Sequence, residues 1–78
     1  MEQLIEEQLI EKDIFPVCMN MNARGDSITY YKGKDIEVHV KNNSGSVELS
    51  SRKEGEECWK WTWIRKKEDV SKFLKELN

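Results

Sequence analysis

Hydrophobic and polar positions alternate with two different periods along the chain, helical at both ends and strand-like between them. Near the C-terminus, apolar residues recur three and four positions apart, which is the spacing of one buried helix face. These residues are Val70, Phe73, Leu74 and Leu77. Acidic residues come early in this stretch and lysines later, the order that the helix dipole favours. The pattern predicts a helix over 67–77.

The N-terminal segment is rich in strong helix formers and contains no helix-breaking residue, so it predicts a helix over 2–12. On a helical wheel, Leu4, Ile5 and Leu9 share an arc of about 140°, whereas Ile10 falls outside that arc. An apolar residue outside the buried stripe rests either on a second surface of the same chain or on a partner chain.

Between the two helices, apolar and polar residues alternate at every second position, as in strands with one buried face. The connections between these segments are short, and short connections force neighbouring strands to be antiparallel. We therefore predict a single α+β domain over 1–78, in which an antiparallel meander of four to five strands is flanked by an N-terminal and a C-terminal helix. The expected strands cover about 17–22, 27–32, 35–41, 46–52 and 57–64.

The last expected strand carries all three tryptophans of the chain at alternate positions, so their rings project from one face of the sheet. Two uses of such a face are open. In the first, at least two of the rings are core residues beneath the C-terminal helix, because a small domain needs large buried side chains. In the second, the rings form a platform on which unpaired bases stack. We expect the first arrangement.

Basic residues surround the tryptophan strand, and a basic surface interleaved with aromatic rings suits single-stranded DNA or RNA. Acidic residues near the same strand would repel phosphates and dilute this surface. The candidate nucleic-acid-binding residues are Trp59, Trp61, Trp63, Arg52, Lys60, Arg65 and Lys66. A small non-enzymatic binding module with such a sheet face is the leading functional hypothesis.

Length and charge narrow the alternatives. The chain has 78 residues and a formal net charge of −2, with 37% hydrophobic and 36% charged residues. A domain of this size is marginally stable unless a partner adds core, and no apolar run approaches the ~20 residues that span a bilayer. Residues 1–13 hold five acidic residues and one basic one, a net of −4, which leaves +2 for the rest. The body of the chain is therefore mildly basic.

The acidic N-terminal helix supports a second hypothesis, a small protein-binding regulator such as a phage or mobile-element inhibitor of a host defence enzyme. An acidic helix could occupy a basic groove by imitating phosphates. Its candidate contacts are Glu2, Glu6, Glu7, Ile10 and Glu11. A third reading, an oligomerising subunit such as a homodimer, follows from apolar residues in excess of the helix stripe, namely Ile10, Ile14 and Phe15.

Candidate chemistry is sparse. Cys18 and Cys58 lie 40 positions apart without a close pair, which favours free thiols on strands over a disulfide or a metal site. His39 shares the polar face of its strand with Glu37 and Lys41, a setting typical of a solvated histidine. We expect no enzymatic activity and no cofactor. The N-terminus lacks the basic and apolar regions of a secretory signal, so a cytoplasmic location is expected.

The second half of the chain resembles a known family in its layout. The polar strand 46–52, an acidic and basic turn, the aromatic strand and the helix sequence 67–74 together resemble a PUR repeat, a unit of four strands and a helix. The resemblance covers residues 35–77. It implies a protein that binds single-stranded DNA or RNA, that dimerises through two repeats, and that contacts unpaired bases with a curved sheet.

Overall fold

The structure is a computed structural model that describes residues 2–43 and 45–77, apart from the side chain of Glu2. It contains a helix, five strands and a second helix in that order. The elements are α1 (Glu2–Glu11), β1 (Phe15–Met21), β2 (Ser27–Lys32), β3 (Ile36–Asn43), β4 (Ser46–Lys53), β5 (Lys60–Ile64) and α2 (Lys67–Glu76). The predicted α+β fold, an antiparallel meander with a helix at each end, is confirmed.

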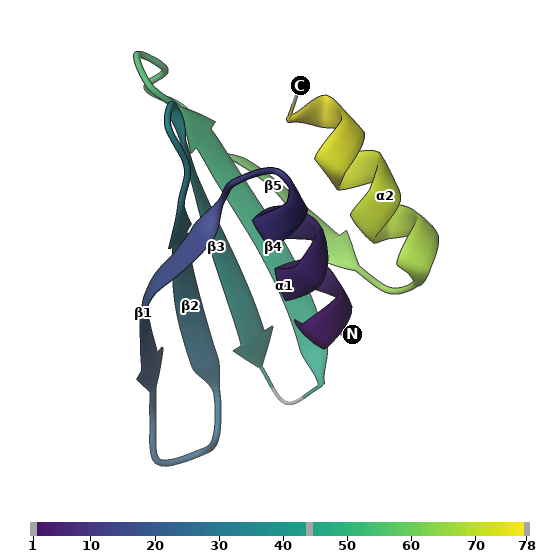
Figure 1. The fold of residues 1–78 in the computed structure, drawn as a ribbon. Coiled ribbons are helices and arrows are strands. Elements are labelled where there is room, and N and C mark those ends of the chain that lie inside the picture. Colours follow the sequence, from purple (N-terminus) through teal and green to yellow (C-terminus); the bar gives the residue numbers. More distant parts are fainter. Residues whose placement is uncertain (1, 44, 78) are drawn as a thin grey trace.

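The strands form one antiparallel sheet in the order β1-β2-β3-β4-β5, so each strand pairs with its neighbour in sequence. Both helices pack on the same face of this sheet, and the other face is left open (Figure 1). Strands β1 and β5 are the two edges. The sheet therefore has one covered face, one open face and two edges with different side chains.

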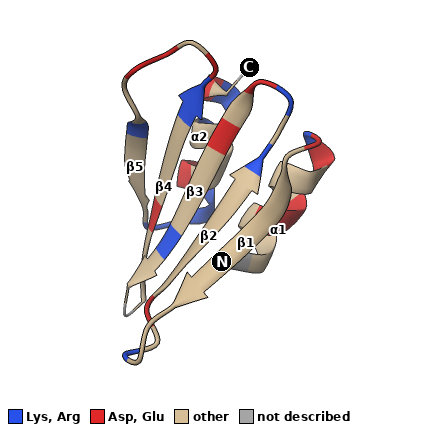
Figure 2. Ribbon diagram, turned by 90° about the vertical axis from the view of Figure 1, so that its left-hand side faces the viewer, with Lys and Arg blue, Asp and Glu red and all other residues tan. Residues whose placement is uncertain are grey.

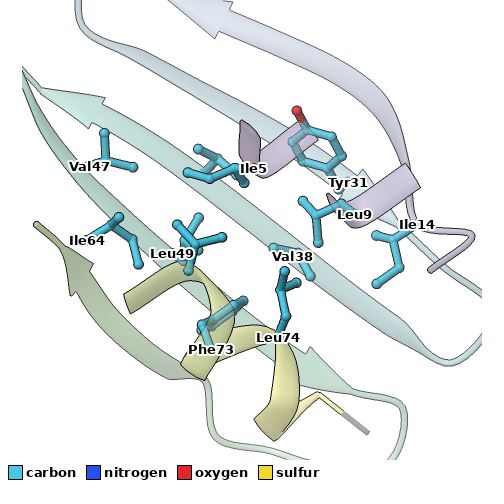
Figure 3. Packing of buried hydrophobic residues seen from close by; sticks show 12 residues of the cluster. Ile5, Leu9, Ile14, Tyr31, Val38, Val47, Leu49, Ile64, Phe73 and Leu74 are labelled. Carbon is cyan, nitrogen blue, oxygen red and sulfur yellow. The ribbon is translucent and has the colours of Figure 1, made fainter. Parts of the chain in front are cut away.

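The hydrophobic core lies between the sheet and the two helices, and Figure 3 shows its side chains converging from both layers. Helix α1 contributes Ile5 and Leu9, and α2 contributes Val70, Phe73 and Leu74. The sheet contributes the residues of the covered face, which include Tyr31, Val38, Val40, Val47, Leu49 and Ile64. Because burial of apolar side chains drives folding, this two-layer core determines which side of every strand faces outward.

Helix α1 is held against the sheet by a tight connection to β1. The backbone N–H of Ile14 donates to the carbonyl of Leu9 at 2.9 Å, which ends the helix, and Asp13 adopts a left-handed conformation with a φ of 60°. Gly33 lies beneath this connection, and a Cβ there would come within 3.0 Å of both Ile14 and Ile36. A side chain at position 33 would therefore require the Ile14 and Ile36 side chains to shift.

Helix α2 is fixed directly after β5 by a carboxylate at its first turn. One Asp69 oxygen accepts hydrogen bonds from the backbone N–H groups of Arg65, at 2.9 Å, and Lys66, at 3.2 Å. The bond from Arg65 is the main reason that the pKa of Asp69 lies below its usual value. This contact turns the chain from the end of β5 onto the covered face.

Four of the five strands differ from their predicted bounds, and the new starting points of β1 and β5 have structural consequences. Strand β1 starts at Phe15 and contains a bulge between Pro16 and Cys18, because proline cannot supply a ladder hydrogen bond. Strand β5 starts at Lys60 rather than at residue 57, so the first tryptophan precedes the strand. Residues 35–77, the range that resembles a PUR repeat, contain three strands, β3, β4 and β5, followed by α2. A unit of four strands and a helix would have to include β2 as well.

Candidate nucleic-acid interface

The open face of the sheet collects aromatic and basic side chains from four strands in register. One row of paired residues crosses the whole sheet, from Cys18 through Tyr30, His39 and Ser50 to Trp61. A second row, parallel to it, joins Ile28, Lys41, Glu48 and Trp63. Figure 2 views the molecule from the open side, with the helices behind the sheet. We call these two rows, together with Arg52 and Trp59, the aromatic face.

The centre of the aromatic face is a chain of contacting rings. The Tyr30 and His39 rings meet edge to face with centroids 4.6 Å apart, and His39 and Trp59 are tilted against each other at 4.4 Å. The guanidinium carbon of Arg52 lies 4.9 Å from the centre of the Trp59 ring, within reach of a cation–π interaction. Ser50 sits on this open side, yet it is only 8% exposed, because side chains surround it. The cluster is therefore a packed surface.

The expectation that at least two tryptophans are core beneath the C-terminal helix is wrong. Trp61 is 60% exposed and Trp63 is 44% exposed. Their rings meet edge to face, with centroids 6.3 Å apart. The reason lies in the register with β4: Ile64 pairs with buried Val47, which directs the apolar position of β5 toward the helices. Strict alternation then places the two rings on the open side.

Trp59 behaves differently from the other two rings because it precedes β5 and pairs with no residue of β4. Its side chain is half-buried and lies against His39, within the cluster described above. Two kinds of ring therefore share the aromatic face. Trp59 is already occupied by protein contacts, whereas Trp61 and Trp63 present ring surface to solvent.

Charges of both signs lie on the open face. The pairing places the cations Lys32, Lys41 and Arg52 on it, together with the carboxylates of Glu37 and Glu48. Arg52 approaches Glu37 at 3.8 Å, but both side chains are about two-fifths exposed, and an ion pair of this kind contributes little to stability. Arg52 can therefore turn toward an added phosphate at small cost.

The other predicted nucleic-acid contacts are not brought together. Lys60 alternates with Trp61 and is paired with Ser51, whose side chain is buried on the covered side, so Lys60 belongs to the face opposite the rings. Arg65 and Lys66 are exposed in the connection between β5 and α2, where their backbone N–H groups bind Asp69. Of the predicted cations, only Arg52 contacts an aromatic ring of the face.

The acidic candidates occupy the opposite side of the molecule. Glu6, Glu7 and Glu11 are exposed on α1, and Ile10 is 38% exposed beside them. The side chain of Glu2 lies outside the described residues. Helix α1 stands behind the sheet when the open face is viewed, as Figure 2 shows. The acidic helix and the aromatic face are therefore separate surfaces.

Sequence reasoning missed three residues of the aromatic face. Tyr30 and Lys41 were not singled out, and His39 was interpreted as solvated, whereas it is half-buried between two rings. The available signal was the phase of alternation: Tyr30 precedes buried Tyr31, and His39 and Lys41 flank buried Val40. Combined with the hairpin registers, that phase would have placed them on one face with the tryptophans.

The environment of His39 disfavours its charged form. Burial lowers the pKa of the imidazole, and the cations Lys41 and Arg52 lower it further, while Glu37 acts in the opposite direction. The neutral ring is therefore the form that packs against Tyr30 and Trp59 at neutral pH.

The cysteines lie apart, and both are exposed free thiols. Cys18 is on β1, whereas Cys58 is in the connection before β5 and not on a strand as predicted. Among the described residues, no group of three or more His, Cys, Asp and Glu side chains is placed to hold a metal ion. No helix in the described part of the chain has the length and apolar character to cross a membrane.

Comparisons with known proteins add no relative: the chain has no significant match to a protein-family model, a curated protein or a solved structure. The fold and the surface chemistry are therefore the observations from which function is inferred.

Proposed function

We propose that the protein is a small non-enzymatic binding module that holds single-stranded DNA or RNA on its aromatic face. The observation that carries the proposal is the exposure of the Trp61 and Trp63 rings on the open side of the sheet, next to a packed cluster of further rings. Exposed indole rings on a monomer surface are costly in water and are typical of binding sites.

Unpaired bases would stack on the exposed rings, and the phosphates between them would meet the cations of the same face. Stacking of a base on an aromatic side chain contributes about 1–3 kcal/mol and depends little on sequence. Lys41 lies in the same row as Trp63, and Arg52 lies against Trp59. With Glu37 and Glu48 nearby, the face holds few cations in excess. Stacking should therefore supply more of the affinity than charge does.

A fluorescence titration tests the proposal. The intrinsic tryptophan emission is followed while a single-stranded oligonucleotide of mixed sequence is added at a low and at a moderate salt concentration. We expect quenching with an affinity that falls as salt rises, because bound phosphates release counterions. Duplex DNA of the same sequence is the matched control, since its bases are not free to stack. No change in emission at low salt would remove the proposal.

A second candidate function is supported by the acidic surface of α1. Three exposed carboxylates flank the partly exposed apolar residue Ile10, a combination that fits a basic groove on a partner protein. Charge reversal of Glu6, Glu7 and Glu11 would abolish capture of such a partner and leave the fold intact, because these side chains are outside the core. Capture that survives this change would place the interface elsewhere.

A further inference from the structure

Strand β1 is an uncovered edge of the sheet with an apolar surface. All of its residues are exposed, and the exposed fractions of Val17, Met19 and Met21 are 65%, 58% and 64%. No described strand pairs with its outer side. Natural proteins normally protect such edges with charged residues, short strands or bulges. Here the protection lies at the start of the strand, in Pro16 and the bulge at Val17, and it leaves Cys18–Met21 available for pairing.

The hairpin geometry shows which backbone groups face outward. The N–H of Asn22 donates to the carbonyl of Asp26 at 3.0 Å, which makes these two residues a hydrogen-bonded pair. Such pairs alternate along an antiparallel ladder. Met21 and Met19, which face Ser27 and Thr29, therefore belong to non-hydrogen-bonded pairs. Their backbone N–H and C=O groups point away from β2 and toward the free edge.

The side chains of β1 select the partner. No residue of Phe15–Met21 is charged, whereas each of the other four strands carries at least one charged side chain. The opposite edge, β5, begins with Lys60 and so resists pairing. An uncharged strand attracts neither a basic nor an acidic segment, and it can meet a copy of itself without like charges in contact.

We propose that β1 is the self-association surface of this protein: two copies pair β1 against β1, antiparallel, about a two-fold axis at Met19. In this register Met19 faces Met19 of the second copy as a hydrogen-bonded pair, and Val17 faces Met21. Every apolar side chain on the covered side then meets another apolar one. On the open side Cys18 faces Asn20, and Val17, which the bulge leaves without a partner in β2, is the last residue at that end of the new ladder.

The consequence is one continuous sheet through both copies. A two-fold axis perpendicular to the sheet keeps both pairs of helices on one side and both open faces on the other. The Val17 and Met19 side chains line a groove beside α1, so the partner strand would also cover this groove. The two acidic α1 helices would lie on the same side of the joined sheet and repel each other. Because salt screens this repulsion, added salt should strengthen the dimer. This is opposite to the effect of salt on nucleic-acid binding.

The test uses analytical ultracentrifugation of the full chain over a range of concentrations, which we expect to show a reversible monomer–dimer equilibrium. Met19→Lys and Met19→Glu each place two like charges at the axis, and each should weaken dimerisation by at least ~100-fold. An equimolar mixture of the two variants should dimerise again, because opposite charges then meet. Ile10→Lys is the control, since it also replaces an exposed apolar residue but lies on α1.

A disulfide variant tests the register without adding charge. Asn20→Cys combined with Cys58→Ser should give a covalent dimer on mild oxidation, because positions 18 and 20 of the two copies face each other at a non-hydrogen-bonded site of suitable spacing. Cys58→Ser alone should cross-link far more slowly. A wild-type chain that stays monomeric at all concentrations overturns the proposal. So does a folded Met19→Lys variant that dimerises normally, and so does failure of the disulfide variant to cross-link. None of these outcomes bears on nucleic-acid binding to the aromatic face.

Discussion

The two faces of the sheet are made from the same strands, yet they have opposite compositions. On the covered face Val38, Val40 and Leu49 are at most 4% exposed and lie beneath both helices. On the open face, one residue away along each strand, are rings, cations and carboxylates. The covered face can be explained by stability alone. The open face cannot, because exposed tryptophans add little to folding and raise the risk of aggregation.

The same comparison separates two kinds of ring. Trp59 is held by His39 and Arg52, and so it belongs to the structure of the open face. Trp61 and Trp63 touch each other and solvent. The difference indicates that the first ring organises the surface and that the other two are available to a ligand.

The largest effect is expected from the covered face. Leu49→Ala removes a fully buried side chain at the centre of the core and should lower the free energy of unfolding by about 2–5 kcal/mol. Trp61→Ala, on the open face of the neighbouring strand, should change it by about 1 kcal/mol or less. Urea unfolding monitored by circular dichroism measures both. Equal losses of unfolding free energy would show that the open face contributes as much to stability as the covered face does.

For ligand binding the order should reverse. Trp61→Ala and Trp63→Ala should each weaken binding of a single-stranded oligonucleotide by about 1–3 kcal/mol, since each removes a stacking surface. Fluorescence anisotropy of a labelled oligonucleotide measures the loss. Ile10→Ala is the matched control, because it also truncates an exposed apolar residue, but on α1. A loss of the same size in the control would contradict the assignment to the open face.

Charge should matter less than stacking, and it should matter on one face only. Lys41→Gln and Arg52→Gln should each reduce the slope of log affinity against log salt by about 0.7, the value for one phosphate contact on a single strand. Lys60→Gln removes a cation from the other face and should leave the slope unchanged. Anisotropy titrations at several salt concentrations give the three slopes. A reduced slope for Lys60→Gln would place phosphates on the covered side or at the β5 edge.

The smallest effect concerns pH. Because the pKa of His39 is lowered in the folded state, chiefly by burial, the unfolded chain binds its proton more readily. The stability that depends on the neutral ring is present above the unfolded pKa, near 6.5, and is lost as the pH falls through the lower folded value. Thermal unfolding between pH 7.5 and 5 should therefore show a decline that His39→Gln reduces. An unchanged decline in that variant would assign it to other groups.

The fold could be predicted from the sequence because its signals are local. The period of Val70, Phe73 and Leu74 indicates a helix whatever it packs against, and short turns leave antiparallel pairing as the only choice. The orientation of the tryptophans could not be predicted in the same way. Alternation shows that Trp61 and Trp63 share a face, but only the pairing of Ile64 with Val47 shows which face it is.

The composition of the aromatic face depends on long-range register for the same reason. Tyr30, His39 and Trp61 come from three separate segments, and their row exists because two hairpins and the β4–β5 pairing align them. Lys60 shows the opposite error: it is adjacent to two tryptophans in sequence but on the other side of the sheet. Sequence proximity therefore groups Lys60 with the rings, although it lies on the other side, and it leaves out Lys41, which lies on the same side as the rings.

The most direct test of the aromatic face as a ligand surface is a two-dimensional ¹H–¹⁵N NMR titration of the labelled full chain with an unlabelled single-stranded oligonucleotide. Each indole N–H gives its own signal, and the helices serve as an internal reference. We predict shifts in the Trp61 and Trp63 indole signals and in the β3 and β4 amides of the two rows, with the amides of α1 unchanged. Shifts confined to α1, or none at low salt, would contradict a ligand surface on the open face.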